Sequence, residues 1–192
     1  MIALDVEHNS RWSPELEAIQ RVDWDAFFSL TFQRKPTGYW PAVRTFFKYL
    51  RTVGPQLDLD YRSIQFALRY EHGEKTGRPH LHALMRAVPV NTAALFCWKH
   101  GWEGDFLKYE RANPLAATYK SGRFVADENG IGCGSARVRK YHEVKDEACD
   151  YFVKKAASKY EAGKIPLADK IFFSRAFTNR LKGLQHLENT AA

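Results

Sequence analysis

Two stretches of alternating apolar and polar residues, joined by a short glycine-containing loop, constrain the fold of this 192-residue chain more than any other feature. The first stretch is Ser63–Tyr70, and the second runs from His80 to Ala87. Alternation with a period of about two residues is typical of a β-strand with one buried face. The intervening loop, GEKTGRP, is too short for a parallel crossover, so the two strands are predicted to form an antiparallel hairpin.

Elsewhere the apolar periodicity switches between about 2 and about 3.6 residues, which indicates an α+β fold. Further strands are predicted at Ala26–Phe32 (AFFSLTF), at Ala136–Tyr141 and in the strand-like segment IFFSRAF of the C-terminal tail. Helices are predicted at Tyr39–Val53, ended by Gly54-Pro55, from Asn91 as N-cap to about His100 with Gly101 as its stop, and at Asp146–Tyr160.

The charge balance favours a polyanionic partner. Lys and Arg number 29 against 22 Asp and Glu, which gives a formal net charge of +7. Basic surface attracts phosphate through the release of condensed counterions, although many basic proteins bind no nucleic acid. Hydrophobic residues make up 45% of the chain, so its bulk is expected to fold around a core rather than to be disordered.

Several classes are disfavoured. The chain has no run of about 18 apolar residues, and its start, MIALDVEHNSRW, lacks the features of a secretory signal. We therefore expect no membrane association and a cytoplasmic location. Cys97, Cys133 and Cys149 are widely spaced and are expected to be free thiols. No phosphate loop of the G-x-x-x-x-G-K-[ST] type occurs, so no nucleotide cofactor is expected.

His80 and His82 lie two residues apart on a predicted strand, so their imidazoles should project from the same face. If Glu71 pairs near them across the hairpin, the three form a two-His, one-carboxylate site, which suits Mn²⁺ or Mg²⁺ acting on phosphate. A one-residue change of register would place His72 there instead. In the competing interpretation, the histidines are ordinary core residues, since H-x-H pairs on strands are common by chance.

Tyr151, Lys154 and Lys155 lie off the apolar stripe of the predicted helix at 146–160. At about 100° per residue, Lys155 is about 40° and Lys154 about 60° from the tyrosine. The two ammonium groups favour the phenolate form and can neutralise phosphate, so Tyr151 is a candidate nucleophile. Taken alone, a surface tyrosine among lysines is more often a solvated face.

The segments AFFSLTF, EHGEKTGRPHLHALM and YFVKK, in that order, resemble the three motifs of the HUH endonucleases. The closest resemblance is to the rolling-circle replication initiators of small single-stranded-DNA phages and plasmids. The central motif is the most specific, because it combines a Glu, the EKTGRP loop and a His-hydrophobic-His triplet. The resemblance covers about residues 26–160 and is weakest between 102 and 134.

This resemblance implies an α+β domain of ferredoxin-like (RRM-like) arrangement. Its sheet usually has five antiparallel strands flanked by helices, with the His pair on a central strand and the Tyr on a helix against the sheet. We expect a single domain over residues 1–192, with a core at about 24–178 and an extension at each end. By motif position, the metal ligands are His80, His82 and Glu71, the nucleophile is Tyr151, and its helper is Lys154 or Lys155.

The activity implied by the resemblance is site-specific nicking and joining of single-stranded DNA, which initiates rolling-circle replication through a 5′-phosphotyrosine intermediate in a bacterial or archaeal host cell. The expected partners are a single-stranded DNA origin, with or without a hairpin, and a host helicase, because the chain has no helicase motif of its own. Initiators of those phages often carry a second Tyr where this chain has Lys155, so a single-tyrosine enzyme is expected. The alternatives are a single-tyrosine HUH transposase and a non-catalytic single-stranded DNA-binding module.

Basic residues near the motifs are candidates for binding the DNA backbone, and exposed aromatic residues are candidates for stacking on bases. The basic candidates are Arg34, Lys35, Arg78, Arg86, Arg137, Arg139 and Lys140, each of which could equally be a solvated charge. The aromatic candidates are Tyr39, Trp40 and Trp102, although Trp is more often found in a core.

Overall fold

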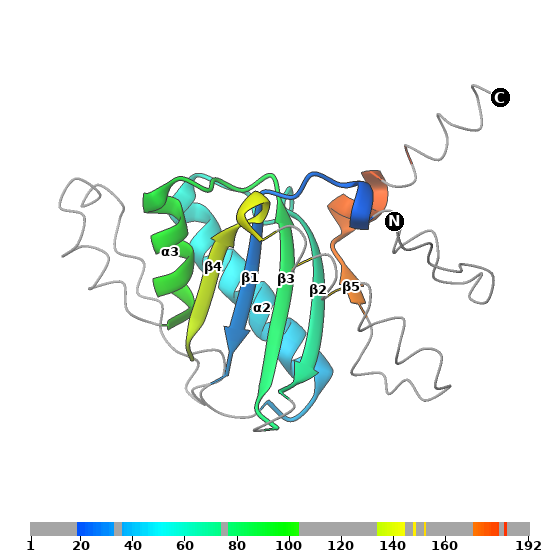
Figure 1. The fold of residues 1–192 in the computed structure, drawn as a ribbon, viewed down its shortest axis with the longest axis vertical. Coiled ribbons are helices and arrows are strands. Elements are labelled where there is room, and N and C mark those ends of the chain that lie inside the picture. Colours follow the sequence, from blue (N-terminus) through cyan, green and yellow to red (C-terminus); the bar gives the residue numbers. More distant parts are fainter. Residues whose placement is uncertain are drawn as a thin grey trace.

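The computed structural model describes residues 19–32, 36–73, 77–103, 134–144, 148, 152, 171–180 and 183 of the chain. Within these residues, five antiparallel strands form one sheet with flanking helices, as Figure 1 shows. The predicted α+β fold class is confirmed.

The strand order across the sheet is β4-β1-β3-β2-β5. The predicted hairpin is therefore the pair β2–β3, and β3 is the central strand. On its other side β3 is hydrogen-bonded to β1, and β4 and β5 are the two edge strands of the sheet. The bounds of the strands are β1 Ala26–Thr31, β2 Gln65–His72, β3 Pro79–Arg86, β4 Ala136–Lys140 and β5 Ile171–Phe173.

The hairpin is shifted slightly from its predicted position. β2 begins at Gln65 rather than Ser63, because Ser63 belongs to a turn in which both its N–H and its hydroxyl donate to the Asp60 carbonyl. It also continues past Tyr70, because Glu71 and the residue after it still find cross-strand partners on β3. The extension matters for the site, since it adds a carboxylate to the paired part of the hairpin.

α2 spans Tyr39–Val53, as predicted, and a 3₁₀ turn, η1, follows at Gly54–Leu57. The apolar stripe of α2 packs on one face of the sheet, and Figure 1 shows the helix running behind the strands. Its buried side chains recur at three- and four-residue steps, which is the spacing that predicted the helix. They are Tyr39, Ala42, Val43, Phe46, Tyr49, Leu50 and Val53.

α3 spans Thr92–Glu103 and lies beside α2. Its N-cap is Asn91, as predicted, because the Asn91 side-chain oxygen accepts a hydrogen bond of 2.8 Å from the N–H of Ala94. The prediction that Gly101 ends the helix is wrong. The helix continues because Trp102 is fully buried, and its indole N–H donates to the Thr31 carbonyl at 2.8 Å.

Two segments differ from their predicted form at their C-terminal ends. β4 stops at Lys140, and Tyr141 opens a 3₁₀ turn, η3 (Tyr141–Glu143), in which its N–H bonds to the Asp25 carbonyl. In IFFSRAF only the first three residues form a strand, and residues 175–180 are helical. Ser174 explains the change, because its hydroxyl accepts from the N–H of Phe177 as an N-cap does.

Alternation along β3 divides the molecule into two apolar clusters. Leu81 and its neighbours at every second position pack with α2 and α3 in the larger cluster. Leu84 belongs to the smaller cluster on the other face, together with Phe27 and Phe177. Of the helix predicted at 146–160, only Ala148 and Phe152 are described, and both are helical and fully buried in that second cluster.

No helix among the described residues is long and apolar enough to cross a membrane. Cys97 is a buried free thiol, as expected, whereas Cys133 and Cys149 lie outside the described residues.

Candidate metal centre

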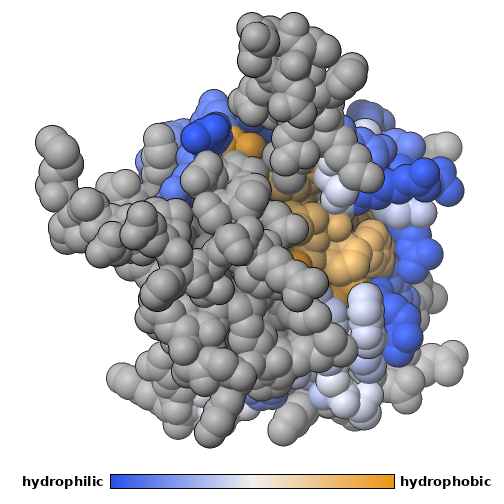
Figure 2. All heavy atoms as spheres, turned by 90° about the vertical axis from the view of Figure 1, so that its right-hand side faces the viewer, coloured by the Kyte–Doolittle hydropathy of each residue, from blue (hydrophilic) through white to orange (hydrophobic). Residues whose placement is uncertain are grey.

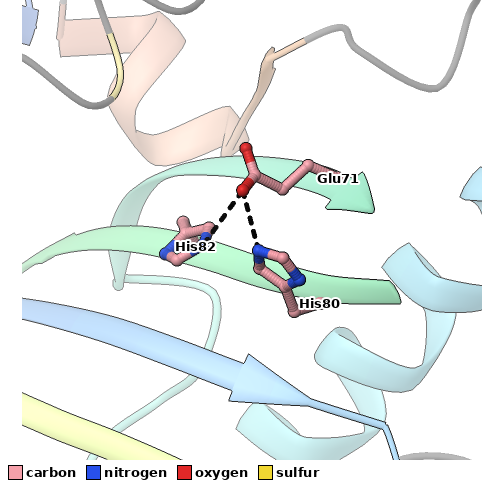
Figure 3. A group of neighbouring side chains, drawn as sticks. All are labelled: Glu71, His80 and His82. Carbon is pink, nitrogen blue, oxygen red and sulfur yellow. Dashed lines mark hydrogen bonds and ion pairs between the residues drawn. The ribbon is translucent and has the colours of Figure 1, made fainter. Parts of the chain in front are cut away.

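Glu71, His80 and His82 come together on the face of the sheet opposite α2 (Figure 3). In the β2–β3 register Glu71 lies directly opposite His80, and this pairing turns all three side chains to one face. One potential ligand atom from each residue lies within 4.8 Å of the other two. The cluster could therefore hold a divalent metal ion.

The three ligand atoms converge from two adjacent strands. Oε1 of Glu71 is 2.7 Å from Nε2 of His80 and 3.6 Å from Nε2 of His82. The carboxylate thus reaches both imidazoles, and Figure 3 shows the two rings turned toward it from alternate positions on β3. Two imidazole nitrogens and one carboxylate oxygen form a mixed donor set for a divalent metal ion.

The other ring nitrogen of each histidine has its own partner. Nδ1 of His80 lies 3.1 Å from the Arg78 carbonyl, and Nδ1 of His82 lies 2.8 Å from the Ser29 hydroxyl. A carbonyl can only accept, so Nδ1 of His80 donates and its Nε2 is left to bind a cation. Metal-ligating histidines show this outer hydrogen bond, which fixes the tautomer and the ring orientation.

Arg69 lies behind the carboxylate. It is fully buried, sits opposite His82 in the sheet, and places its Nε 3.7 Å from Oε2 of Glu71. Within the described part of the chain, Oε2 is buried with no hydrogen-bond partner. The guanidinium therefore offsets the negative charge at Oε2, while Oε1 is the oxygen that approaches the histidines.

The electrostatics of the cluster favour the ligand forms of its members. Burial alone would raise the pKa of Glu71, but its interactions with His80 and His82 and the charge of Arg69 outweigh burial and lower that pKa. Burial lowers the pKa of His82, and the attraction of Glu71 offsets only part of this effect. An ionised carboxylate and a neutral imidazole are the forms that bind a metal ion.

The alternative third ligand, His72, does not join the cluster. It is exposed, and its Nε2 lies 3.4 Å from the hydroxyl of Tyr70. Tyr70 belongs to the cluster that packs against α2, so the two side chains lie on the face of β2 away from Glu71. The strand register thus places Glu71, and not His72, beside His80 and His82 as the third potential ligand.

A groove of about 670 Å³ opens beside the two histidines and runs toward the β4 edge of the sheet. Arg137 and Arg139 of β4 lie opposite Ser29 and Phe27 of β1, which puts both arginines on the face that carries the histidines. Exposed Lys99 of α3 also lines the groove. Three cationic side chains and one carboxylate, that of Glu103, therefore border the space next to the candidate metal centre.

The other predicted DNA-binding residues are distributed away from this groove or fall outside the described residues. Arg86 lies at the far end of β3, where its guanidinium donates to the Asp23 carbonyl at 2.8 Å. Lys140 pairs with Glu143 at 3.9 Å, and Arg78 is exposed at the end of the hairpin loop. Arg34 and Lys35 lie outside the described residues.

The predicted nucleophile Tyr151 and its neighbours Lys154 and Lys155 also lie outside the described residues. Phe152, which follows Tyr151 in the sequence, is described. Its ring centroid is 6.3 Å from that of Phe27, and the Phe27 ring stacks on His82 at 5.6 Å. A chain of two aromatic contacts thus connects Phe152 to the histidine pair.

Sequence reasoning missed three residues that shape the site: Ser29, Arg69 and Lys99. A polar residue inside the apolar run AFFSLTF was a usable signal for Ser29. Arg69 was visible as a charge on the alternating strand, two residues before Glu71 and therefore on the same face. Lys99 had no such signal, because only the packing of α3 beside β4 brings it to the groove.

No family model, no curated protein and no solved structure matches this chain. It is an α+β protein whose central hairpin presents a two-histidine, one-carboxylate cluster beside a groove bordered by cationic residues.

Proposed function

We propose that this protein is a metal-dependent HUH-type endonuclease that nicks and rejoins single-stranded DNA at a specific site and so initiates rolling-circle replication. The observation that carries the proposal is the convergence of Glu71, His80 and His82 on the central strand pair of a five-stranded antiparallel sheet. The motif order of the sequence supports it, because the same three residues stand at the positions that the resemblance assigns to metal ligands.

In the proposed reaction the Tyr151 phenolate oxygen attacks the phosphorus of one phosphodiester. The P–O3′ bond breaks, the 3′ oxygen takes up a proton, and the 5′-phosphate remains on the tyrosine. One phosphodiester replaces another, so the reverse attack by a 3′-OH can rejoin strands, and no nucleotide cofactor is needed. Lys154 or Lys155 would neutralise the phosphate during the attack.

The contact of Phe152 with Phe27 supports this role for Tyr151. Phe27 stacks on His82, and Phe152 is the next residue in the sequence after the proposed nucleophile. Phe152 is thus the described residue nearest in sequence to Tyr151, and its ring contacts lead through Phe27 to His82.

A divalent cation, for which we propose Mn²⁺ or Mg²⁺, would be held by Oε1 of Glu71 and Nε2 of His80 and His82, and when bound it supplies Lewis-acid polarisation of a non-bridging phosphate oxygen. The chain itself fixes the two rings through Ser29 and the Arg78 carbonyl. These hydrogen bonds hold both Nε2 atoms toward one point before substrate binds.

The groove beside the cluster fits a nucleic-acid backbone. Lys99, Arg137 and Arg139 border it, and cationic side chains along a groove bind phosphates in a manner that depends strongly on salt. We propose that the scissile strand lies in this groove. The proposed context is replication of a phage or plasmid in a bacterial or archaeal cell, with a host helicase to open the duplex.

The test is direct capture of the covalent intermediate. The full chain is incubated with a pool of random single-stranded DNA and Mn²⁺, and DNA that stays attached after denaturation is sequenced. We expect one enriched sequence, linked through its 5′-phosphate to Tyr151 by mass spectrometry, and no attachment in chelator. Absence of any covalent DNA in the presence of Mn²⁺ would refute the proposal.

A further inference from the structure

The outer face of α2 carries a row of exposed basic residues. Arg44, Lys48 and Arg51 are all exposed, and the sequence of α2, YWPAVRTFFKYLRTV, contains no acidic residue. At about 100° and 1.5 Å per residue, these three and Trp40 fall within an arc of about 80°, with a spacing of about 4 to 6 Å along the helix. We call these four residues the α2 stripe.

The charges of the α2 stripe are not offset within the described part of the chain. None of Arg44, Lys48 and Arg51 forms an ion pair with a described residue. The guanidinium carbon of Arg51 instead lies 6.0 Å from the centroid of the Tyr61 ring, which Arg62 approaches from 5.2 Å. The Tyr61 ring therefore adjoins the α2 stripe, and it contacts one cation of the stripe, Arg51, and one outside it, Arg62.

Trp40 is the one large hydrophobic side chain among the described residues that is substantially exposed, at 50%. It meets Phe172 of the edge strand β5 at 6.3 Å, and Phe47 of α2 meets the same ring at 5.7 Å. Figure 2 faces the side of the molecule that carries β5 and shows an apolar patch there, bordered by hydrophilic residues. An aromatic surface therefore adjoins one end of the basic stripe.

We infer that the α2 stripe binds single-stranded nucleic acid, separately from the metal centre. Basic residues that follow a backbone, combined with aromatic rings on which bases stack, are the features of such surfaces. Duplex DNA would satisfy the charges but would leave Trp40 without a base to stack on. α2 packs on the face of the sheet opposite Glu71, His80 and His82, so the two surfaces cannot be parts of one groove.

This second surface goes beyond the proposed nicking reaction and does not require it. Binding at the stripe needs neither a divalent ion nor the nucleophile. A chain with both surfaces could hold one part of a strand on α2 while another part lies beside the histidines.

The experiment measures the affinity of the full chain for a fluorescent random single-stranded oligonucleotide in chelator, over a range of salt concentrations. It compares the wild type with the triple variant Arg44→Glu/Lys48→Glu/Arg51→Glu. Three lost phosphate contacts should reduce the slope of log K against log salt by about 2, at about 0.7 per contact. Trp40→Ala should weaken binding by about fivefold or more with little change in slope.

Two controls separate a local effect from a general one. Arg175→Glu is measured beside the single variant Lys48→Glu, because it makes the same charge change at an exposed position outside α2, and it should cost clearly less affinity than Lys48→Glu. The variant Arg44→Lys/Arg51→Lys keeps the charges and should retain the salt slope. Thermal unfolding of each variant shows that the fold is intact.

Unchanged affinity in the triple variant, or a loss in Arg175→Glu equal to that in Lys48→Glu, would overturn the inference. Preference for duplex over single-stranded DNA, or an unchanged affinity in Trp40→Ala, would overturn the assignment of single strands. His80→Ala distinguishes the two proposals: it should abolish cleavage while leaving binding at the stripe unchanged.

Discussion

Oε1 of Glu71 on β2 lies 2.7 Å from Nε2 of His80, the residue directly opposite it on β3. This contact exists because of the hairpin register, since a slip of one residue would turn His72 toward the histidines and Glu71 away from them. The register in turn keeps Tyr70 and Leu81 in the apolar cluster against α2. Burial of one face thus determines the donor set on the other.

The first prediction concerns the third ligand. Glu71→Gln preserves the shape of the side chain but removes its charge, so Mn²⁺ affinity measured by calorimetry should fall by more than the roughly 10- to 100-fold typical of outer-sphere partners. His72→Gln is the matched control, because His72 is the neighbouring residue on the opposite face, and it should bind Mn²⁺ like the wild type. A loss confined to His72→Gln would mean that the register-based assignment is wrong.

The second prediction concerns Ser29. Its hydroxyl is 2.8 Å from Nδ1 of His82 and orients that ring. Ser29→Ala should weaken Mn²⁺ binding by about 10- to 100-fold while leaving the melting temperature nearly unchanged. Thr52→Ala removes a hydroxyl that bonds to the Lys48 carbonyl on α2, far from the cluster in the fold, and should not alter metal affinity. Equal affinities for the two variants would contradict an orienting role for Ser29.

The third prediction concerns stability of the metal-free protein in acid. Burial lowers the pKa of His82 below 6.5, and the pKa of Glu71 falls below 4.5 because its interactions with His80, His82 and Arg69 outweigh the opposing effect of burial. In both cases the unfolded chain binds more protons than the folded one, so the free energy of unfolding must decrease as the pH falls.

The decrease should begin as the pH drops through 6.5, where His82 becomes protonated in the unfolded chain, and should steepen below 4.5 as Glu71 follows. Urea unfolding in chelator, at about pH 7.5 and about pH 5.5, measures the first part. His82→Gln should flatten the change between these two conditions. Identical pH dependence in the wild type and in His82→Gln would rule out His82 as its source.

The alternating pattern of the hairpin strands and the buried apolar face of α2 could be predicted from sequence, because each depends on local periodicity. The bounds of α2 were predicted at Tyr39 and Val53 and observed there. The end of α3 was not predictable in this way, because it depends on burial of Trp102 and on a hydrogen bond to Thr31, a residue distant in the chain. Propensity at Gly101 favoured a stop, and tertiary packing overrode it.

In the candidate site, too, the features that depend on local periodicity could be predicted, and those that depend on tertiary packing could not. The two histidines and the carboxylate could be found because strand periodicity and a short loop limit which residues can meet. The ion pair between Arg69 and Glu71 could not be predicted, since the approach of Arg69 to Oε2 depends on side-chain packing inside the sheet. The groove beside His82 likewise depends on how α3 packs against β4, a contact between segments that no local pattern connects.

The fourth prediction concerns the Cys97 thiol. Burial raises its pKa to about 12, and only the thiolate is nucleophilic. At about pH 8 roughly one thiol in 10⁴ is ionised, so the native protein should react with a thiol reagent far more slowly than a free cysteine. The measurement uses a Cys133→Ser/Cys149→Ser variant, in which Cys97 should react only once urea unfolds the chain. Rapid reaction without urea would show that α3 does not bury this thiol.

The last prediction concerns the proposed nucleophile. Tyr151→Phe removes only the hydroxyl, so the variant should form no covalent DNA adduct while it retains Mn²⁺ affinity and the salt-dependent binding of DNA. The matched control is Tyr160→Phe, because Tyr160 is expected on the apolar side of the same predicted helix, and it should form the adduct at the wild-type rate. Lys154→Ala and Lys155→Ala tested separately should identify the helper as the one whose loss slows adduct formation. An adduct that persists in Tyr151→Phe would exclude this tyrosine as the nucleophile, whatever the metal affinity of the cluster proves to be.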